Sequence, residues 1–396
     1  MLELMRKQLG YNPGYTQTGH RMQAACPKEG GPMPRNLKTP HGEISFPAFL
    51  PDATYGAVKA CGPDDLAAVG TPALVMNAYH LMQKPGSSTV SALGGLHEMT
   101  GWDGPIMTDS GGFQAYSVIR EDPSRGSIGK NGITILPEGS SRKFLLTPEK
   151  AIQLQLAYGT DIAVCLDECT HPDDGREVQE NAVRRTLEWA SRCRSEFDRL
   201  VQGGRKKEKP LLFGVVQGGS YEDLRRLSAS ELSSIGFDGM GFGGWPMDGE
   251  GNLVVDILRS VREALPEEMP LHALGIGHPK HMVTCWNLGY DTFDCSLPTR
   301  DARRGRLYTS EMPLSEADFA GRWFKYAYMQ DERHVKDRRP VMTGCDCPTC
   351  RNYSAGFLHH LMKHGESLFY RLATVHNLRF MNLLCDELGR RGRKDR

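Results

Sequence analysis

The sequence predicts an α/β fold of the (β/α)8 TIM-barrel class, and two patterns lead to this prediction. Eight short segments look like strands, and most of them are continuously apolar, which is typical of parallel strands that helices cover on both faces. Helix-like stretches lie between many of them, and such alternation repeated eight times favours a closed barrel. A doubly wound sheet is the alternative, but no glycine-rich dinucleotide-binding fingerprint follows the first strand.

The expected strands and helices follow from these patterns in chain order. The strands are predicted at residues 46–50, 74–79, 105–110, 161–167, 211–217, 236–244, 271–277 and 292–297. The clearest helices are predicted at residues 148–158, 177–194, 221–235, 253–264 and 279–288. The segment 113–146 is too long for a simple connection, and it contains a strand-like run at 133–136. We therefore expect an inserted hairpin there.

Polar residues and glycines recur where the expected strands end. One Asp at a strand end means little, because Asp commonly caps the following helix. Three Asp, one Gln and paired glycines at one rim are hard to assign to capping alone, and that rim is where barrel enzymes keep their active sites. The residues are Asn77, His80, Asp109, Ser110, Gly111, Gly112, Asp167, Glu168, Cys169, Gln217, Gly218, Gly219, Gly243, Gly244, Gly275, Gly277 and Asp294.

The last expected strand brings Asp294 to the rim and is stopped by Pro298. Four arginines follow at once: Arg300, Arg303, Arg304 and Arg306. A carboxylate beside such a cluster indicates chemistry on a phosphate-bearing substrate. The competing interpretation is a structural ion pair between Asp294 and one of these arginines.

Charge and composition narrow the setting of the protein. The net charge of the 396 residues is zero, so a nucleic-acid contact would need local basic patches, such as the arginines after Pro298, residues 205–209 or the tail 390–396. No run of about 18 apolar residues exists, and no membrane span is expected. Eleven cysteines without an export signal predict a reducing, cytoplasmic location, where clustered cysteines bind metals.

Cys345, Cys347 and Cys350 form a CxCxxC motif whose spacing suits a tetrahedral zinc ion. Candidates for the fourth ligand are His359, His360, His364 and His376, and the spacing alone does not choose among them. No expected catalytic carboxylate lies near the motif, so we interpret the zinc as structural. We expect a loose arm at residues 1–39, a catalytic barrel at 40–310, and a zinc-binding subdomain with barrel-closing helices at 311–396.

These residues resemble the tRNA-guanine transglycosylase family from about residue 40 to residue 380. The resemblance rests on separated motifs: Pro40-His41-Gly42, Asn77-Ala78-Tyr79-His80-Leu81 with Pro85-Gly86, Thr108-Asp109-Ser110-Gly111-Gly112-Phe113-Gln114, Asp167-Glu168-Cys169, Val216-Gln217-Gly218-Gly219, Phe293-Asp294-Cys295 with Pro298-Thr299-Arg300, and the three cysteines with His376-Asn377. The resemblance selects His376 as the fourth zinc ligand.

The resemblance implies an enzyme, a pentosyltransferase that exchanges a guanine in tRNA for a 7-deazaguanine base without breaking the backbone. It implies Asp294 as the nucleophile and Asp109 as the general acid and base. The base would contact Ser110, Phe113, Asp167, Cys169, Gln217, Gly243, Gly244 and Leu274, while Arg300, Arg303 and Arg304 would hold RNA. It also implies one structural Zn²⁺ per chain and a homodimer through the zinc region.

This sequence departs from the family in three places. The loop 243–250 contains Trp245, Pro246 and Met247 where the family has smaller residues, which leaves the incoming base open, although Cys169 favours a small aminomethyl-deazaguanine. The segment 308–344 is unlike the family's usual connection to zinc, and the chain ends soon after His376. A DNA-modifying relative and a non-catalytic RNA-binding subunit are the alternatives, and the presence of both Asp109 and Asp294 disfavours the latter.

Overall fold

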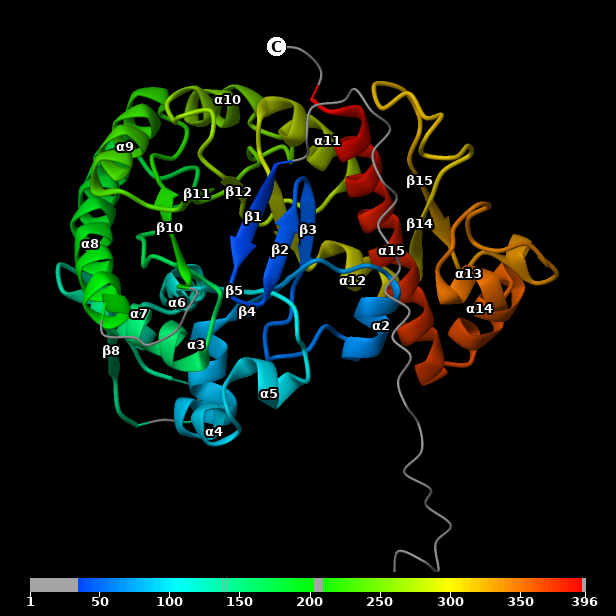
Figure 1. Cartoon of the computed structure of the whole chain (residues 1–396), viewed down its shortest axis with the longest axis horizontal. Coiled ribbons are helices and arrows are strands. Elements are labelled where there is room, and N and C mark those ends of the chain that lie inside the picture. Colours follow the sequence, from blue (N-terminus) through cyan, green and yellow to red (C-terminus); the bar gives the residue numbers. More distant parts are fainter. Residues whose placement is uncertain (1–34, 138, 140, 203–208, 394–396) are drawn as a thin grey trace, which may run out of the picture. The chain divides into compact units, whose positions relative to one another are not determined.

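The computed structural model describes residues 35–137, 139, 141–202 and 209–393 (Figure 1). Eight parallel strands form one ring in the order β3, β13, β12, β11, β10, β9, β5, β4. Residues 1–34 of the predicted arm, most of the basic segment 205–209 and the end of the basic tail lie outside the described residues. The strands are β3 (Ala48–Pro51), β4 (Leu74–Asn77), β5 (Ile106–Asp109), β9 (Ile162–Val164), β10 (Leu211–Val216), β11 (Gly239–Phe242), β12 (Leu271–Ala273) and β13 (Thr292–Cys295).

The ring closes between the first strand and its neighbour in sequence. Asp52, just after β3, pairs in parallel with Val75 of β4, and the Ala53 N–H donates to the Val75 carbonyl at 2.7 Å. On its other side β3 pairs with β13, so the first and last strands of the barrel are adjacent. The prediction of a (β/α)8 barrel is confirmed, and each strand lies at or within its expected segment, except that β3 runs one residue further.

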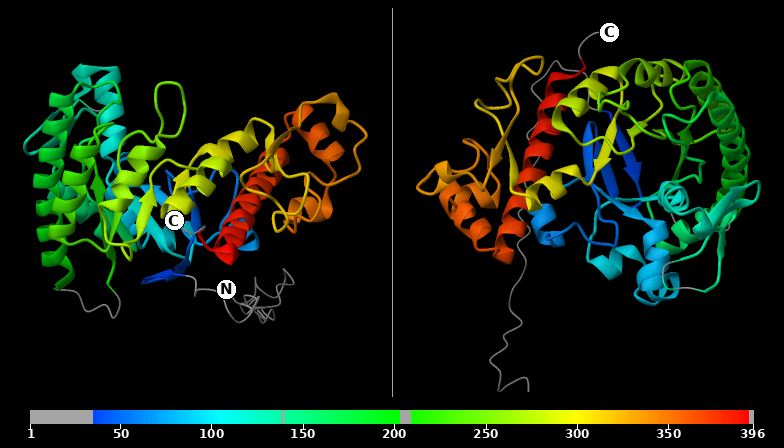
Figure 2. Two further views of the ribbon diagram at one scale, coloured as in Figure 1. Left: turned by 90° about the horizontal axis from the view of Figure 1, so that it is seen from above. Right: turned by 180° about the vertical axis from the view of Figure 1, so that it is seen from behind.

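Helices form an outer layer around these strands (Figure 2, right). Local signals set their ends: Thr147 caps α7 by accepting from the Lys150 N–H, and Gly159 ends it with φ +82°. The helices are α2 (Pro63–Ala68), α3 (Ala78–Leu81), a π-helical turn (Met82–Gly86), α4 (Ser87–Ala92), α5 (Leu96–Thr100), α6 (Gly112–Glu121), α7 (Pro148–Tyr158), α8 (Arg176–Gln202), α9 (Glu222–Ile235), α10 (Val255–Glu263), α11 (Pro279–Leu288) and α12 (Leu297–Arg303).

The insertion between β5 and α7 is larger than a hairpin. It begins with helix α6, continues through a 3-10 turn (Pro123–Arg125), and forms an antiparallel sheet of β6 (Gly126–Gly129), β7 (Gly132–Ile135) and β8 (Phe144–Leu146). The expected hairpin is the β6–β7 pair, and β8 adds a third strand. Two glycines at the start of α6 hid this helix from sequence reasoning, because glycine is a poor helix former.

A short hairpin, β1 (Asn36–Thr39) with β2 (Gly42–Ser45), lies at the N-terminal end of the barrel strands, so the last residues of the predicted arm form a strand. The buried Asp161 fixes it there by accepting the backbone N–H groups of His41 and Ile106 at 3.0 and 2.8 Å. The rings of His41 and His97 stack at 3.6 Å against the same carboxylate. Both carboxylate oxygens accept backbone N–H groups, so this cluster has a structural role: it joins the hairpin to the barrel strands by hydrogen bonds.

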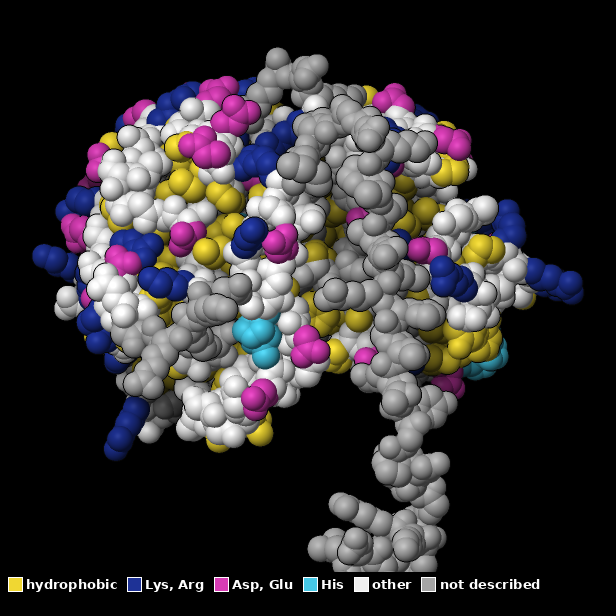
Figure 3. All heavy atoms as spheres, in the orientation of Figure 1, with side chains coloured by type: hydrophobic (Ala, Val, Ile, Leu, Met, Phe, Trp, Pro, Cys, Tyr) yellow, Lys and Arg dark blue, Asp and Glu magenta, His cyan; other side chains and the backbone are white. Residues whose placement is uncertain are grey.

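The C-terminal part contains the antiparallel pair β14 (Arg306–Thr309) and β15 (Lys325–Tyr328), a 3-10 turn (Glu332–His334), and helices α13 (Pro348–Asn352), α14 (Ala355–Lys363) and α15 (Ser367–Arg391). The long helix α15, red in Figure 1, packs against α12 and α13 and also contacts β3 of the barrel. On the barrel side of the face in Figure 3, acidic and basic side chains are interspersed. Within the described residues, no helix has both the length and the apolar character that a membrane crossing requires.

Candidate active site

A cavity of about 400 Å³ lies at the C-terminal rim of the barrel strands. It collects most of the side chains that the sequence placed at this rim, and it adds several that were not predicted. The predicted residues that line it are Asp109, Ser110, Phe113, Asp167, Cys169, Gly243, Gly244, Leu274 and Asp294. Asn77 and His80, which the sequence also placed at this rim, line it too, and the lining that was not predicted includes Asp52, Thr54, Trp245 and Met247.

Asp294 reaches this cavity from the end of β13. One carboxylate oxygen, Oδ1, accepts the Gly275 N–H at 2.9 Å and lies 3.2 Å from Nε2 of His272. No arginine within the described residues lies within ion-pair distance of Asp294, which argues against the interpretation as a structural Asp–Arg pair. Because Oδ1 is held by the Gly275 N–H and faces the His272 ring, Oδ2 is the oxygen left to act in the cavity.

His272 on β12 is a site residue that sequence reasoning missed. Its ring is buried, and Nδ1 lies 2.8 Å from the hydroxyl of Thr292 on β13. When that hydroxyl donates to Nδ1, the proton of the neutral ring sits on Nε2, which is close to Asp294 but outside hydrogen-bond geometry. The sequence does show a histidine within an apolar strand. The direction in which its side chain points, however, depends on how the strands pair.

Asp109 ends β5 on the same side of the barrel as Asp294. Its carboxylate accepts from the Asn77 amide at 2.7 Å and from the Gly111 N–H at 3.2 Å. Burial, reinforced by the nearby carboxylates of Asp294 and Asp52, raises the pKa of Asp109 to about 8. Asp109 is therefore a neutral acid at pH 7 beside the held carboxylate of Asp294.

The two glycines after Ser110 are required by close packing. Gly111 has φ +79°, and a Cβ there would lie 2.3 Å from Cβ of Tyr79. A Cβ on Gly112 would lie 2.9 Å from the Asp167 carbonyl oxygen. Larger residues would push α6, and with it Phe113, away from the cavity.

The raised pKa of Asp109 predicts a pH dependence of stability. Between its ordinary pKa near 3.8 and the folded value of about 8, the folded protein keeps a proton that the unfolded chain has released. The free energy of unfolding should therefore fall as pH rises through this window. Asp109→Asn should flatten this dependence in urea titrations at pH 5 to 9, whereas Asp256→Asn, a change at a side chain that is 91% exposed, should leave it unchanged.

Another acid that lines the cavity, Asp167, follows β9, the strand that pairs with β5. Burial raises the pKa of Asp167 to about 6, and its Oδ2 accepts from the Gln217 amide at 2.6 Å. Gln217 thus lies behind Asp167 with its amide nitrogen engaged. A Cβ on Gly243 would lie 2.6 Å from that nitrogen, which explains the glycine. Burial also raises the pKa of Cys169, so this residue is a neutral thiol.

Arg225 on α9 supports the backbone near Gln217 and Gly243. It was not predicted from the sequence. Its guanidinium is buried and donates to the carbonyls of Val216, Gly219 and Gly243 at 2.6, 2.9 and 2.9 Å. It also lies 4.2 Å above the ring of Phe242. Arg225 therefore fixes the backbone of the Gly243 loop.

The walls of the cavity are apolar. Phe113, in the first turn of α6, and Leu274, after β12, both line it, and Phe113 keeps 41% of its surface exposed. The ring of Trp245 meets Phe113 edge-on at 5.8 Å. The unusual loop 243–250 therefore places an aromatic side chain at the cavity mouth.

The predicted arginines follow directly after Asp294. Arg300 and Arg304 are exposed, and Arg303 is half-buried with its guanidinium donating to the Thr299 carbonyl at 2.9 Å. None of the three has an ion-pair partner among the described carboxylates, whereas Arg306 pairs with the buried Asp301. Three cations near the cavity are thus available to an anionic partner.

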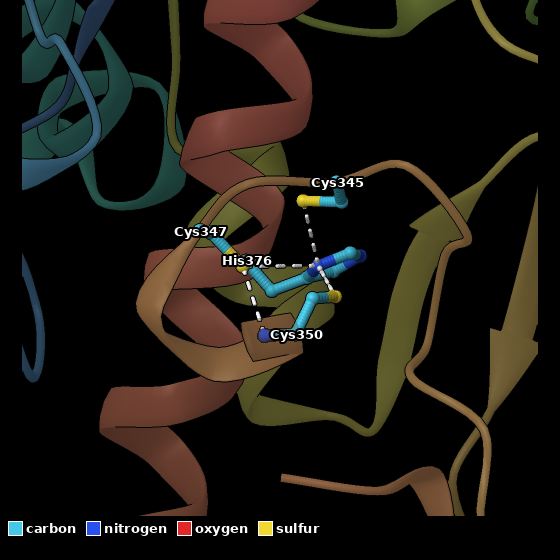
Figure 4. Close-up of side chains that lie close together, drawn as sticks. All are labelled: Cys345, Cys347, Cys350 and His376. Atoms are coloured by element: carbon cyan, nitrogen blue, oxygen red, sulfur yellow. Dashed lines mark hydrogen bonds between the residues drawn. The ribbon is translucent and has the colours of Figure 1, made fainter. Parts of the chain in front are cut away.

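Cys345, Cys347, Cys350 and His376 meet in a cluster suited to binding a metal ion (Figure 4). The three sulfurs lie 3.9, 3.7 and 3.3 Å from Nδ1 of His376. Ligand atoms around a tetrahedral zinc ion are separated by roughly 3.5–3.8 Å, given bonds of about 2.0–2.3 Å. His359 instead bonds the Met329 carbonyl, so the geometry selects His376.

This cluster is connected to the arginine segment through two residues of α15. Nε2 of His376 lies 2.7 Å from the Tyr308 carbonyl, which orients Nδ1 toward the sulfurs. The neighbouring Asn377 accepts the Tyr308 N–H and donates to the carbonyls of Pro298 and Arg306. The metal-binding cluster therefore anchors both ends of the segment that carries Arg300 and Arg303.

Comparisons with known proteins identify the family of this chain. The model of the family described as "Queuine tRNA-ribosyltransferase" matches residues 35–393. Proteins named queuine tRNA-ribosyltransferase are similar over most of their length. The one from Novosphingobium aromaticivorans is 40% identical over 87% of this chain and 86% of its own, and the one from Desulforamulus reducens is 37% identical over 91% and 90%. The chain therefore belongs to the queuine tRNA-ribosyltransferase family, whose members are pentosyltransferases.

Proposed function

We propose that this protein exchanges a guanine in tRNA, at the anticodon wobble position, for a 7-deazaguanine base by double displacement. The observation that carries the proposal is the convergence of Asp109 and Asp294 on one cavity beside three available arginines. The two carboxyls differ in role because their surroundings differ. Asp294 accepts a hydrogen bond from the Gly275 N–H, while burial and two neighbouring carboxylates keep Asp109 protonated.

In the first step, Oδ2 of Asp294 attacks C1′ of the ribose, and the bond from C1′ to guanine N9 breaks. The electron pair of that bond leaves with guanine, and Asp109 transfers its proton to the departing base. The product is a glycosyl ester of Asp294 with an ionised Asp109. The Gly275 N–H and His272 stabilise the Asp294 oxygen that does not react.

In the second step, a 7-deazaguanine base occupies the place of guanine. Its N9 attacks C1′ from the same face and releases Asp294, while Asp109 takes the N9 proton. Two inversions at C1′ restore the original configuration, as in retaining glycosidases. Both carboxyls return to their starting states.

The base is held in the plane between Phe113 and Leu274, with Ser110, Cys169 and Gly243 completing its surroundings. Asp167 accepts the N–H groups of the guanine edge, and the Gly244 N–H donates to O6. Gln217 reaches O6 once its amide leaves Asp167. The target nucleotide must be flipped out of its loop to enter, because the cavity is recessed at the barrel rim.

The surrounding groups fit an RNA substrate and a structural metal. Arg300, Arg303 and Arg304 bind phosphates near the target nucleotide. Cys345, Cys347, Cys350 and His376 hold one Zn²⁺, whose four protein ligands leave no position for substrate. The zinc region is also the surface that we propose for a homodimer, which sedimentation would test, and the cytoplasm is its proposed location.

The assay that tests this proposal follows labelled guanine into nucleic acid. Purified protein is incubated with labelled guanine and bulk tRNA, or with duplex DNA, and incorporation is counted. We expect label in tRNA and its removal when unlabelled 7-aminomethyl-7-deazaguanine is added. Label in DNA but not in tRNA, or in neither despite tRNA binding, would contradict the proposal.

The contact of His272 with Asp294 predicts a role in positioning the nucleophile. His272→Phe fills the same space but has no ring nitrogen facing Asp294. We expect kcat to fall roughly 10- to 100-fold because misplaced reacting groups lose about that much, with little change in KM for tRNA. His272→Gln, which retains a side-chain N–H, should recover part of the loss; equal kcat in both variants would remove His272 from the mechanism.

A further inference from the structure

A third carboxylate, Asp52, lines the cavity and has no part in the reaction described above. It lies one residue beyond the end of β3 and pairs with Val75 across the point where the barrel closes. Its Oδ1 accepts from the Thr54 hydroxyl at 2.5 Å, and no cation within the described residues lies within ion-pair distance. Asp52 is thus a largely buried acid with hydrogen-bonding capacity left toward the cavity.

The strand order places Asp52 on the sugar side of the cavity. Asp167, Gln217 and Gly244 follow β9, β10 and β11, which are consecutive strands on one side of the ring. Asp294 and Asp52 lie on the other side, where β13 pairs with β3 and Asp294 stands opposite Leu50. A nucleotide whose base faces the first group and whose C1′ faces Asp294 brings its ribose toward Asp52.

Two other polar side chains on this side, Asn77 and His80, already have partners. The Asn77 amide nitrogen donates to Asp109, and its oxygen accepts the His80 N–H. Nδ1 of His80 lies 3.3 Å from the Tyr55 hydroxyl. Asp52 is therefore the acceptor best placed for a ribose hydroxyl, and burial with the nearby Asp294 raises its pKa.

We propose that Asp52 accepts a hydrogen bond from the 2′-hydroxyl of the target ribose and thereby selects RNA over DNA at that nucleotide. This inference rests on the proposed function and deepens it. The 2′-hydroxyl is the group that distinguishes the two nucleic acids at a given position. Hydrogen bonds to this hydroxyl strengthen as positive charge develops at C1′, so the contact favours the transition state.

The test uses one RNA hairpin that carries the target guanosine and a second hairpin with a single 2′-deoxy substitution at that nucleotide. Labelled-guanine exchange is measured with wild type, Asp52→Ala, Asp52→Asn and the control Asp256→Asn. We expect wild type and control to prefer the all-ribose hairpin by roughly 10-fold or more in kcat/KM. Asp52→Ala should bring that ratio close to one by slowing only the all-ribose reaction.

A ratio that stays at the wild-type value in Asp52→Ala would overturn the inference, even if both reactions slow, because Asp52 would then act through the neighbouring carboxylates. Asp52→Asn keeps the side-chain volume and one acceptor oxygen but not the negative charge, so it should lower the ratio only in part. It serves if the alanine variant does not fold, and an unchanged ratio in it would then overturn the inference. If wild type incorporates no guanine, the proposed function fails, and the affinities of the two hairpins are compared instead. Equal affinities for wild type would then overturn the Asp52 contact as well.

Discussion

The Asp294→Asn variant is expected to fold like the wild type and to lose base exchange by roughly 10⁴-fold or more, as enzymes do when their nucleophile is removed. An amide keeps the shape of the side chain and its contact with the Gly275 N–H, but it cannot form a stable ester with C1′. The measurement is labelled-guanine exchange into tRNA, together with thermal unfolding of both proteins.

A covalent adduct provides the second readout for this variant. Wild-type protein incubated with tRNA and quenched with denaturant should show a slower-migrating band on a denaturing gel, and Asp294→Asn should not. Asp256→Asn, a change at an exposed carboxylate on α10, is the matched control and should keep both the adduct and the activity. An adduct that persists in Asp294→Asn would assign the nucleophile to another residue.

Loss of the metal is expected to have the second largest effect. His376→Ala removes one ligand and the contact with the Tyr308 carbonyl, which together anchor the segment between Pro298 and Tyr308. We expect loss of bound zinc, a decrease in Tm of roughly 10 °C or more, and a parallel loss of tRNA binding, because zinc binding contributes several kcal/mol to folding.

His360→Ala is the matched control for the metal prediction, since His360 is exposed on α14 and outside the cluster. Zinc content is measured by elemental analysis, and binding is measured with a labelled tRNA. A His376→Ala protein with full zinc content would show that another residue completes the site. A zinc-free protein with unchanged tRNA binding would separate the metal from the arginine segment.

The barrel could be predicted from sequence because its strands are buried on both faces and therefore read as continuous apolar runs. The convergence of Asp109 and Asp294, the proposed catalytic pair, was predictable for a related reason: both residues end such runs, and parallel strands bring their carboxyl ends to one rim. The metal cluster was encoded locally by three closely spaced cysteines, but the choice of His376 among four histidines needed the resemblance or the fold.

Other features depend on contacts that no local pattern contains. Helix α6 begins with glycines because there is no room for a side chain next to Tyr79 and Asp167. The low helix propensity of these glycines therefore gives no sign of the helix. His272 and Arg225 lie within stretches that read as ordinary strand and helix, and their roles come from the strands beside them. In the sequence, Asp52 looks like one of the many polar residues that follow an apolar strand and cap the next element. It lies next to the site only because the barrel closes at Asp52 and Val75.

The closure of the ring between Asp52 and Val75 has a consequence for synthesis of the protein. The groups proposed to recognise the base come from one uninterrupted stretch in the middle of the chain, whereas the reactive side draws on the first three barrel strands and the last one. A chain whose synthesis stops before β13 therefore contains the proposed base-contacting residues but lacks the proposed nucleophile and the strand that pairs with β3. We expect such a product to be inactive in base exchange.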